Sequence, residues 1–281
     1  MQNRVASRFG PSTDGGRMEH SLSQPSLVPL LERATEFNWN ASIARSRGVY
    51  AFNSMDARSR SFNLIRAKLM ALRRERKWRM LGIVSATPAV GKSFVSANLA
   101  AAMSRDPRLS TTLVDLDLRR GTVAEIFGIN IEVGVAQYFE SLDPNAAVSA
   151  FRPRGEDLVI IPCIPASVHS AELLASEKAV QMLKAMKASD ERNFFFFDLP
   201  PVYANDDAAT TLELLDGYVF IAEEGKTTRQ EVQSAIEMLG EERLAGVVIN
   251  KYRGGLVSEG RGIEQRYASD YYAQEAEEEP E

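Results

Sequence analysis

The short segment Ala86–Ser93 (ATPAVGKS) constrains the fold of this chain more than any other feature. An apolar run, Met80–Ser85, comes directly before it, and a stretch with helical spacing, Ser93–Ser104, begins at its end. A glycine, lysine and serine at a strand-to-helix junction are typical of a phosphate-binding loop (P-loop), which turns backbone N–H groups and a helix N-terminus toward phosphate oxygens. The usual first glycine of such a loop is Ala86 in this chain.

Apolar strands and amphipathic helices alternate over most of the remaining chain, a pattern typical of a parallel sheet covered on both faces. We therefore predict an α/β fold, a three-layer P-loop NTPase with a mainly parallel sheet and helices on both faces. The predicted helices are Ser61–Arg76, Ser93–Ser104, Ala171–Met186, Asp207–Leu215 and Thr228–Leu239. The predicted strands are Met80–Ser85, Thr111–Asp117, Leu158–Cys163, Phe194–Asp198, Tyr218–Ala222 and Ala245–Asn250.

Three regions follow from the composition along the chain. Residues 1–50 mix Gly, Pro, Ser, Asn and Arg without a sustained period, and we predict that they are mostly disordered. Residues 51–255 are predicted to form the P-loop domain. Residues 256–281 turn polar, end in AEEEPE, and are predicted to be a flexible acidic tail that carries a tyrosine cluster.

The overall composition narrows the possible chemistry and location. Two histidines and one cysteine, Cys163, argue against zinc chemistry, a histidine-based triad and an internal disulfide. No run of 18 apolar residues and no apolar signal core occur, so a cytoplasmic protein is expected. Residues 1–80 carry 15 Lys and Arg against 6 Asp and Glu. That basic segment is either a solvated surface or a docking segment for an acidic partner or the membrane, where the protein would be peripheral.

The P-loop predicts the nucleotide site. Lys92 is expected to reach the β- and γ-phosphates of ATP, and Ser93 to ligate Mg²⁺. The predicted nucleotide-binding residues of the loop and the helix start are Ala89, Val90, Gly91, Lys92, Ser93 and Phe94.

Two further strands are predicted to end in carboxylates. Asp115 and Asp117 follow the apolar residues Leu113 and Val114, and strand alternation places both on one side of the chain. The run Phe194–Phe197 ends in Asp198, as in a Walker B strand, where the carboxylate supports Mg²⁺. Ligands of open α/β sheets bind at the carboxyl edge, where one carboxylate can hold Mg²⁺ and another can accept a proton.

These motifs, ATPAVGKS, DLDLR and DLPP in that order, resemble those of the bacterial tyrosine kinases (BY-kinases) of polysaccharide biosynthesis. Smaller similarities are HSAELLA from His169, the pair Asp207-Ala208, GKTTR from Gly225, and VVIN ending at Asn250. The resemblance covers about residues 55–253.

The resemblance implies an ATP- and Mg²⁺-dependent autokinase that phosphorylates a C-terminal tyrosine cluster, here Tyr267, Tyr271 and Tyr272. It implies that Asp115 acts as the base, with Lys92 and Asp117 as the other catalytic residues. The implied Mg²⁺ ligands are Ser93, Asp117 and Asp198, and the implied contact to the base of the nucleotide is Asn250. It also implies a membrane partner of the chain-length-determining kind as activator, a possible homo-oligomer, and a role in capsule or exopolysaccharide export.

The sequence departs from the family pattern in three places, one of which is the small number of tyrosines, three, in the tail cluster. Ala89 and Val90 stand where the family has glycine and glutamate, and a left-handed backbone at Ala89 would cost about 1 kcal/mol or more. The oligomerising E-x2-R-x2-R pattern is reduced to Arg60, Asn63 and Arg66, of which the last agrees.

Two other functions remain open at this point. A regulatory ATPase of the division-site or chromosome-partition kind would have a lysine where Thr87 stands. A catalytically weak, nucleotide-switched docking protein of polysaccharide export is the alternative that Ala86, Ala89 and Val90 favour. Nucleic-acid binding is not expected, since the basic segment lacks interleaved aromatic residues and the domain is acidic.

Overall fold

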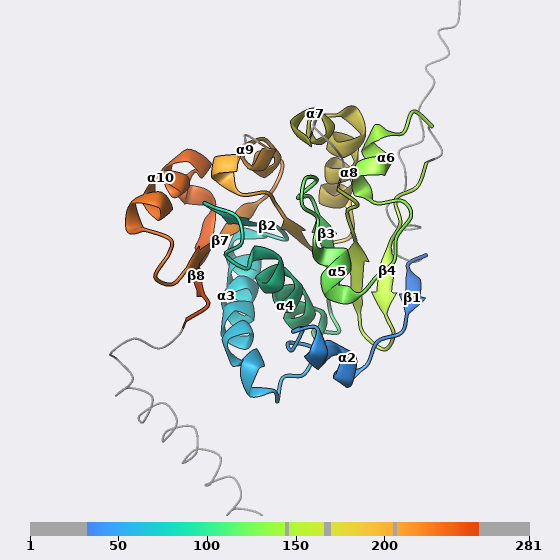
Figure 1. Ribbon diagram of the computed structural model, residues 1–281, viewed down its shortest axis with the longest axis horizontal. Coiled ribbons are helices and arrows are strands. Elements are labelled where there is room, and N and C mark those ends of the chain that lie inside the picture. Colours follow the sequence, from blue (N-terminus) through green and yellow to red (C-terminus); the bar gives the residue numbers. More distant parts are fainter. Residues whose placement is uncertain (1–32, 144–145, 166–169, 205–206, 253–281) are drawn as a thin grey trace, which may run out of the picture.

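The computed structural model describes residues 33–143, 146–165, 170–204 and 207–252 (Figure 1). These residues form one eight-stranded sheet in the order β1-β4-β5-β3-β6-β2-β7-β8. All neighbouring strands run parallel except β4 and β5, so the predicted mainly parallel α/β sheet is confirmed. The strands are β1 Thr35–Phe37, β2 Met80–Ser85, β3 Ser110–Asp115, β4 Phe151–Pro153, β5 Leu158–Ile161, β6 Asn193–Asp198, β7 Gly217–Glu223 and β8 Leu244–Asn250.

Helices cover both faces of the sheet, as predicted (Figure 1). On one face, the core contains side chains of α2 Ala41–Ser46, α3 Arg60–Arg76, α4 Lys92–Ser104 and α5 Val123–Phe127. On the other face, it contains those of α6 Val135–Glu140, α7 Ser170–Leu174, α8 Glu177–Ala188, α9 Asp207–Leu212 and α10 Arg229–Leu239. Three 3-10 turns, η1 Ala57–Ser59, η2 Val202–Ala204 and η3 Glu241–Arg243, complete the described elements.

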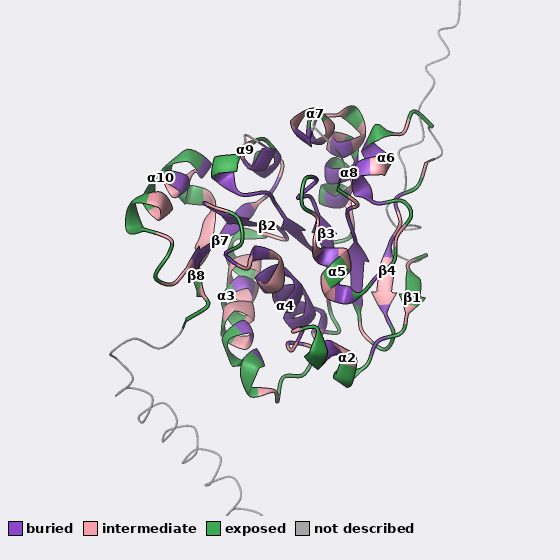
Figure 2. Cartoon of the chain, in the orientation of Figure 1, coloured by how far each residue is buried: buried purple, intermediate pink, exposed green. Residues whose placement is uncertain are grey.

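The central strand β6 shows why the strands read as continuous apolar runs. Phe194 and Phe196 pack into the core on the α4 side, while Phe195 and Phe197 pack into the core on the α8 side. All four side chains are fully buried. Figure 2 shows β2 and β3, in the middle of the sheet, in the colour of buried residues. A strand with two covered faces has no reason to alternate apolar and polar residues.

Residues 33–50 are ordered, although they lie in the segment 1–50 that was predicted to be mostly disordered. Residues 33–50 contain β1, which pairs with β4, and α2, whose start is capped by the Asn40 side chain. Trp39 is buried against the rings of Phe37, Phe52 and Phe127. These aromatic contacts order a segment that has no helical or strand periodicity of its own. Residues 1–32 lie outside the described part of the chain.

Two other predictions need correction. The helix predicted over Ala171–Met186 is two helices, α7 and α8, because Ser176 leaves the helical conformation and caps α8 by accepting from the Ala179 amide. The strand predicted to reach Asp117 ends at Asp115. None of the helices in the described residues combines the length and apolar character needed to cross a bilayer.

Candidate nucleotide site

The P-loop joins β2 to α4, as predicted. Helix α4 begins at Lys92, and its N-cap residue is Gly91, whose φ of 88° lies in the left-handed region. A Cβ on Gly91 would come within 2.2 Å of Asn250 Nδ2, so glycine is required both for the conformation and for this close approach. Ser93 is the second residue of α4, at the positive end of the helix dipole, where an anion is stabilised.

Ala89 also adopts the left-handed conformation, with φ of 66°. The sequence raised this possibility, since the family pattern that the motifs resemble has glycine at this position. An L-residue with a Cβ pays about 1–2 kcal/mol in this conformation. The loop therefore keeps its shape against a local strain that glycine would remove.

The lysine of the loop is buried among carboxylates. Lys92 Nζ lies 2.8 Å from Asp198 Oδ1 and 3.6 Å from Asp117 Oδ2. Burial alone would lower the pKa of Lys92, but Asp198 and Asp117 outweigh it and raise the pKa above its ordinary value. Ser96 Oγ also donates to Asp198 Oδ1, at 3.0 Å.

Asp115, the last residue of β3, and Asp117, two residues beyond it, lie at the same edge of the sheet but in different surroundings. Asp115 is fully buried, and its oxygens accept hydrogen bonds from the amides of Asp117, at 3.2 Å, and Val123, at 3.0 Å. Burial, followed by the nearby charge of Asp198, raises the pKa of Asp115 well above its ordinary value. Asp117 is 7% exposed, and burial raises its pKa although Lys92 opposes the shift.

Sheet topology explains how three distant motifs meet. Strand β6 lies between β3 and β2, with Asp198 paired in register with Asp115 on one side and Ile83 on the other. The P-loop follows β2 directly. The carboxyl edge of three adjacent strands thus carries the lysine and the carboxylates, where open α/β sheets bind their ligands.

The donor set fits a magnesium ion that is shared with a nucleotide. Asp198 Oδ2 is buried and has no hydrogen-bond partner among the described residues, so an acceptor oxygen remains for a cation or its water. Nowhere in the described residues do three or more His, Cys, Asp or Glu side chains form a metal-binding group. Mg²⁺ characteristically uses one or two carboxylates with phosphate oxygens and waters rather than a cage made only of protein.

The end of β8 contacts the P-loop through two side chains. Asn250 Nδ2 donates to the Val90 carbonyl at 2.8 Å, and Lys251 Nζ donates to the Ala89 carbonyl at 2.7 Å. Asn250 was predicted to contact the base of the nucleotide, and the structure places it against the loop backbone. Lys251 was missed, because a lysine just after a strand normally reads as a solvated side chain.

The Phe94 side chain turns away from the loop. Its ring packs against those of Tyr50, at 6.4 Å between centroids, and Phe62, at 6.0 Å. Any role of Phe94 in nucleotide binding would therefore use its backbone rather than its ring.

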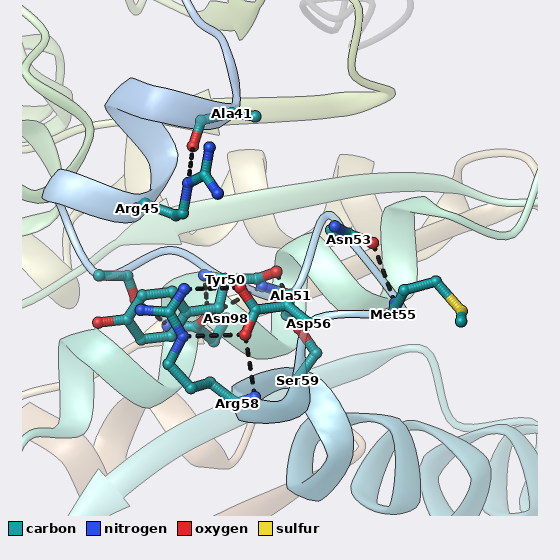
Figure 3. Close-up of polar contacts among 11 residues, drawn as sticks. Ala41, Arg45, Tyr50, Ala51, Asn53, Met55, Asp56, Arg58, Ser59 and Asn98 are labelled. Carbon is teal, nitrogen blue, oxygen red and sulfur yellow. Dashed lines mark hydrogen bonds and ion pairs between the residues drawn. The ribbon is translucent and has the colours of Figure 1, made fainter.

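Asn98, on the same helix, holds the chain that precedes α3. Its side-chain oxygen accepts from the amides of Tyr50 and Ala51 (Figure 3). Its side-chain nitrogen donates to the carbonyls of Gly48 and Phe94. The sequence did not single out Asn98, since an asparagine within a helix carries no such signal by itself.

A second polar network lies beyond the end of β3. Arg119 Nε donates to Ser170 Oγ at 2.7 Å, and Ser170 Oγ donates to Asp207 Oδ2 at 2.6 Å. The arginine of the DLDLR motif and the aspartate of the Asp207-Ala208 pair are thereby joined. The tyrosines Tyr267, Tyr271 and Tyr272, and His169, lie outside the described residues.

A strand, a phosphate loop followed by a helix, and carboxylates at the ends of β6 and of β3 beyond it together define a P-loop nucleotide-binding protein. The family model "CobQ/CobB/MinD/ParA nucleotide binding domain" matches residues 81–273 of the chain. The chain belongs to this family of nucleotide-binding domains.

Curated relatives are named as tyrosine kinases. The chain is 26% identical over 246 residues to tyrosine-protein kinase Etk of Escherichia coli (strain K12), which covers 83% of this chain and 33% of Etk. It is 29% identical over 195 residues to tyrosine-protein kinase YwqD of Bacillus subtilis (strain 168), covering 68% of this chain and 80% of YwqD. The chain thus spans about a third of the length of Etk and most of the length of YwqD.

Among solved structures, the kinase domain of Escherichia coli tyrosine kinase ETK superposes with a TM-score of 0.63 at 26% sequence identity. The superposition covers 74% of this chain and 82% of that domain. The resemblance to bacterial tyrosine kinases that the motifs indicated is confirmed by these similarities.

Proposed function

We propose that this protein is an ATP- and Mg²⁺-dependent protein-tyrosine autokinase that regulates the synthesis and export of capsular or extracellular polysaccharide. The observation that carries the proposal is the cluster of Lys92 with Asp117 and Asp198 behind a P-loop. Etk and YwqD, both named as tyrosine-protein kinases, are 26% and 29% identical to this chain over the aligned residues and support the same function.

Each residue of the cluster has a task in phosphoryl transfer, which depends on positioning and on neutralising charge. Lys92 exchanges its carboxylate partners for the β- and γ-phosphates. Ser93, Asp117 and Asp198 would hold Mg²⁺, which neutralises charge on the transferring phosphoryl group. The backbone amides of the loop orient the phosphates.

The proposed base is Asp115, because a raised pKa suits proton abstraction near neutral pH. Its complete burial means that the tyrosine hydroxyl reaches it only after the segment following β3 moves. Asp117 is the second candidate for the base, since it is less buried and lies closer to Lys92. The phosphate acceptors are Tyr267, Tyr271 and Tyr272.

The proposed setting is the cytoplasmic face of the membrane. There the protein would be activated by a membrane protein of the chain-length-determining kind and would assemble as a homo-oligomer that presents tails to neighbouring subunits. The similarity to Etk and YwqD supports a kinase, and the partner is an inference from the family resemblance.

Phosphotyrosine mass spectrometry tests the autokinase. The purified chain is incubated with Mg²⁺ and ATP beside Lys92→Met and a truncation after Gly260. Phosphate on the tail tyrosines that is absent from Lys92→Met is the expected result. If ATP binds but no phosphate appears, even with the cytoplasmic segment of a membrane partner present, the nucleotide-switched docking protein becomes the better account. The strained backbone at Ala89 is the observation that favours that second function.

A further inference from the structure

We propose that Lys251, together with Asn250, is a positioning residue that holds the P-loop in its phosphate-binding shape. The inference rests on nucleotide binding, which the autokinase proposal also requires, but it does not depend on phosphoryl transfer. It concerns two adjacent residues at the end of β8, about 160 positions along the chain from the loop they contact.

The two contacts fix two consecutive peptide planes of the loop. Lys251 Nζ holds the Ala89 carbonyl at 2.7 Å, and Asn250 Nδ2 holds the Val90 carbonyl at 2.8 Å. In a trans peptide the C=O and the following N–H point in opposite directions. With both carbonyls drawn toward β8, the amides of Val90 and Gly91 point away from β8.

Those amides are left open for an anion. Within the described chain, neither the Val90 nor the Gly91 amide donates to a backbone carbonyl, although Val90 is only 1% exposed. Buried backbone donors nearly always have a partner, so a pair of open amides at a helix start points to a bound anion. Because each carbonyl is held on one side of the loop, the amide of the same peptide is turned toward a phosphate on the other side.

The same contacts account for the alanine in a left-handed position. Ala89 has φ of 66°, where glycine would be free of strain. The Lys251 contact to its carbonyl stabilises the one loop conformation that this φ belongs to. A glycine would adopt this conformation without strain. In this chain, the hydrogen bond from Lys251 to the Ala89 carbonyl stabilises the same conformation instead.

Lys251 is itself held in place. Its ammonium group lies 3.1 Å from Glu223 Oε2 at the end of β7, and this contact lowers the pKa of Glu223. The backbone of Lys251, directly after β8, is also in the left-handed conformation, with φ of 56°. Lys226 forms a similar ion pair with Glu223, at 3.4 Å.

Lys226 supplies the matched control, because it shares Glu223 but makes no hydrogen bond to the P-loop in the described chain. Lys251→Met and Lys226→Met remove the same charge from the same carboxylate. Binding of a fluorescent ADP analogue with Mg²⁺ is measured for both variants, with the thermal unfolding midpoint recorded alongside. Lys251→Met is expected to weaken binding about tenfold, the factor for about 1.4 kcal/mol. Lys226→Met is expected to leave it unchanged.

A second background tests the link to Ala89. In Ala89→Gly the left-handed conformation carries no strain, so the loop depends less on the Lys251 hydrogen bond. Adding Lys251→Met to Ala89→Gly is therefore expected to lower the affinity for the ADP analogue by less than about threefold. A difference of this size between the two backgrounds is typical of residues in direct contact. Lys251→Arg, which retains a donor, is expected to recover most of the affinity of Lys251→Met. Equal losses in the alanine and glycine backgrounds would overturn the proposal, as would a loss that Lys226→Met reproduces.

The readout separates this proposal from the autokinase. Nucleotide affinity reports the loop directly, whereas phosphotyrosine reports the chemistry. A chain that binds the ADP analogue with the expected pattern but never phosphorylates its tail supports the positioning role and removes the autokinase. A chain that phosphorylates its tail, but whose Lys251→Met variant binds the ADP analogue as well as the wild type, supports the autokinase and removes the positioning role.

Discussion

Lys92 Nζ donates to Asp198 Oδ1 at 2.8 Å, so the P-loop lysine and the carboxylate at the end of β6 form a buried ion pair. Lys92 is 7% exposed and Asp198 is fully buried. The pair compensates charges that would otherwise be costly to bury. It also means that phosphate binding exchanges one set of anionic partners of Lys92 for another.

Replacing the lysine is therefore expected to affect stability as well as catalysis. Lys92→Met leaves Asp115, Asp117 and Asp198 buried without a cation, and we expect the free energy of unfolding to fall by about 3–5 kcal/mol near neutral pH. The raised pKa of Lys92 means that its stabilising contribution is fully present below the unfolded-state pKa and is lost only as pH rises through the folded-state pKa.

The pH dependence of the variant distinguishes this cause from simple loss of packing. Without Lys92, the carboxylates are easier to protonate, so the penalty should shrink as pH falls. Urea unfolding of the wild type and Lys92→Met at about pH 8 and about pH 5.5 measures it. A penalty of the same size at both values would contradict the electrostatic explanation.

Binding of Mg²⁺-nucleotide is expected to release protons and to weaken as pH falls. Burial raises the pKa of Asp117, and the folded protein therefore holds a proton there over a range where an unfolded aspartate is ionised. A cation ligand favours the ionised form, so protons compete with Mg²⁺ below the raised pKa. Calorimetry in two buffers of different ionisation enthalpy detects the released protons.

Asp117→Asn is the control for that titration. The ratio of wild-type to Asp117→Asn affinity at each pH removes the protonation of the nucleotide itself. The ratio should fall toward one as pH decreases. A ratio that stays constant would show that Asp117 does not exchange a proton for the cation.

Autophosphorylation rates of single variants distinguish the two candidate bases, Asp115 and Asp117. Asp115→Asn and Asp117→Asn are each expected to lower the autophosphorylation rate constant by about 10²–10⁴-fold if the altered residue is the base. The residue that only orients its neighbour should lower the rate less and should retain the pH profile of the wild type. Rates measured at saturating Mg²⁺-ATP across pH distinguish the two roles.

Asn98 is expected to be among the most sensitive positions away from the nucleotide. Asn98→Ala leaves the amides of Tyr50 and Ala51 and the carbonyl of Gly48 without their partner, at a cost of about 3 kcal/mol or more. Denaturant unfolding measures the loss, and hydrogen exchange should show faster exchange at residues 48–51. Asn53→Ala, at an exposed residue of the same region, should have a much smaller effect, and equal losses would refute the argument.

The core architecture was predictable because the strands are apolar and fully covered. The position of the P-loop, Asp115, Asp117 and Asp198 at one edge of the sheet was also predictable from sequence, since each follows an apolar run that ends there. The segment Trp39–Val49 was not, because its order depends on Phe127 and on the side chain of Asn98, contacts between residues far apart in the chain. The role of Lys251 was hidden for the same reason.

The strand order has a consequence for how the chain is synthesised. Strand β2, which leads into the P-loop, lies between β6 and β7, so Met80 has no neighbouring strand until Phe195 has left the ribosome. The four consecutive phenylalanines of β6 in turn need β2 and β3 at their sides and helices above and below. Until β6 emerges, the apolar residues of β2 have no strand at either side, and exposed apolar segments of this kind favour aggregation. The nucleotide site is thus completed late, when Asn250 and Lys251 have been added. A truncated product lacking β8 and Lys251 would have the P-loop without the hydrogen bonds to its Ala89 and Val90 carbonyls.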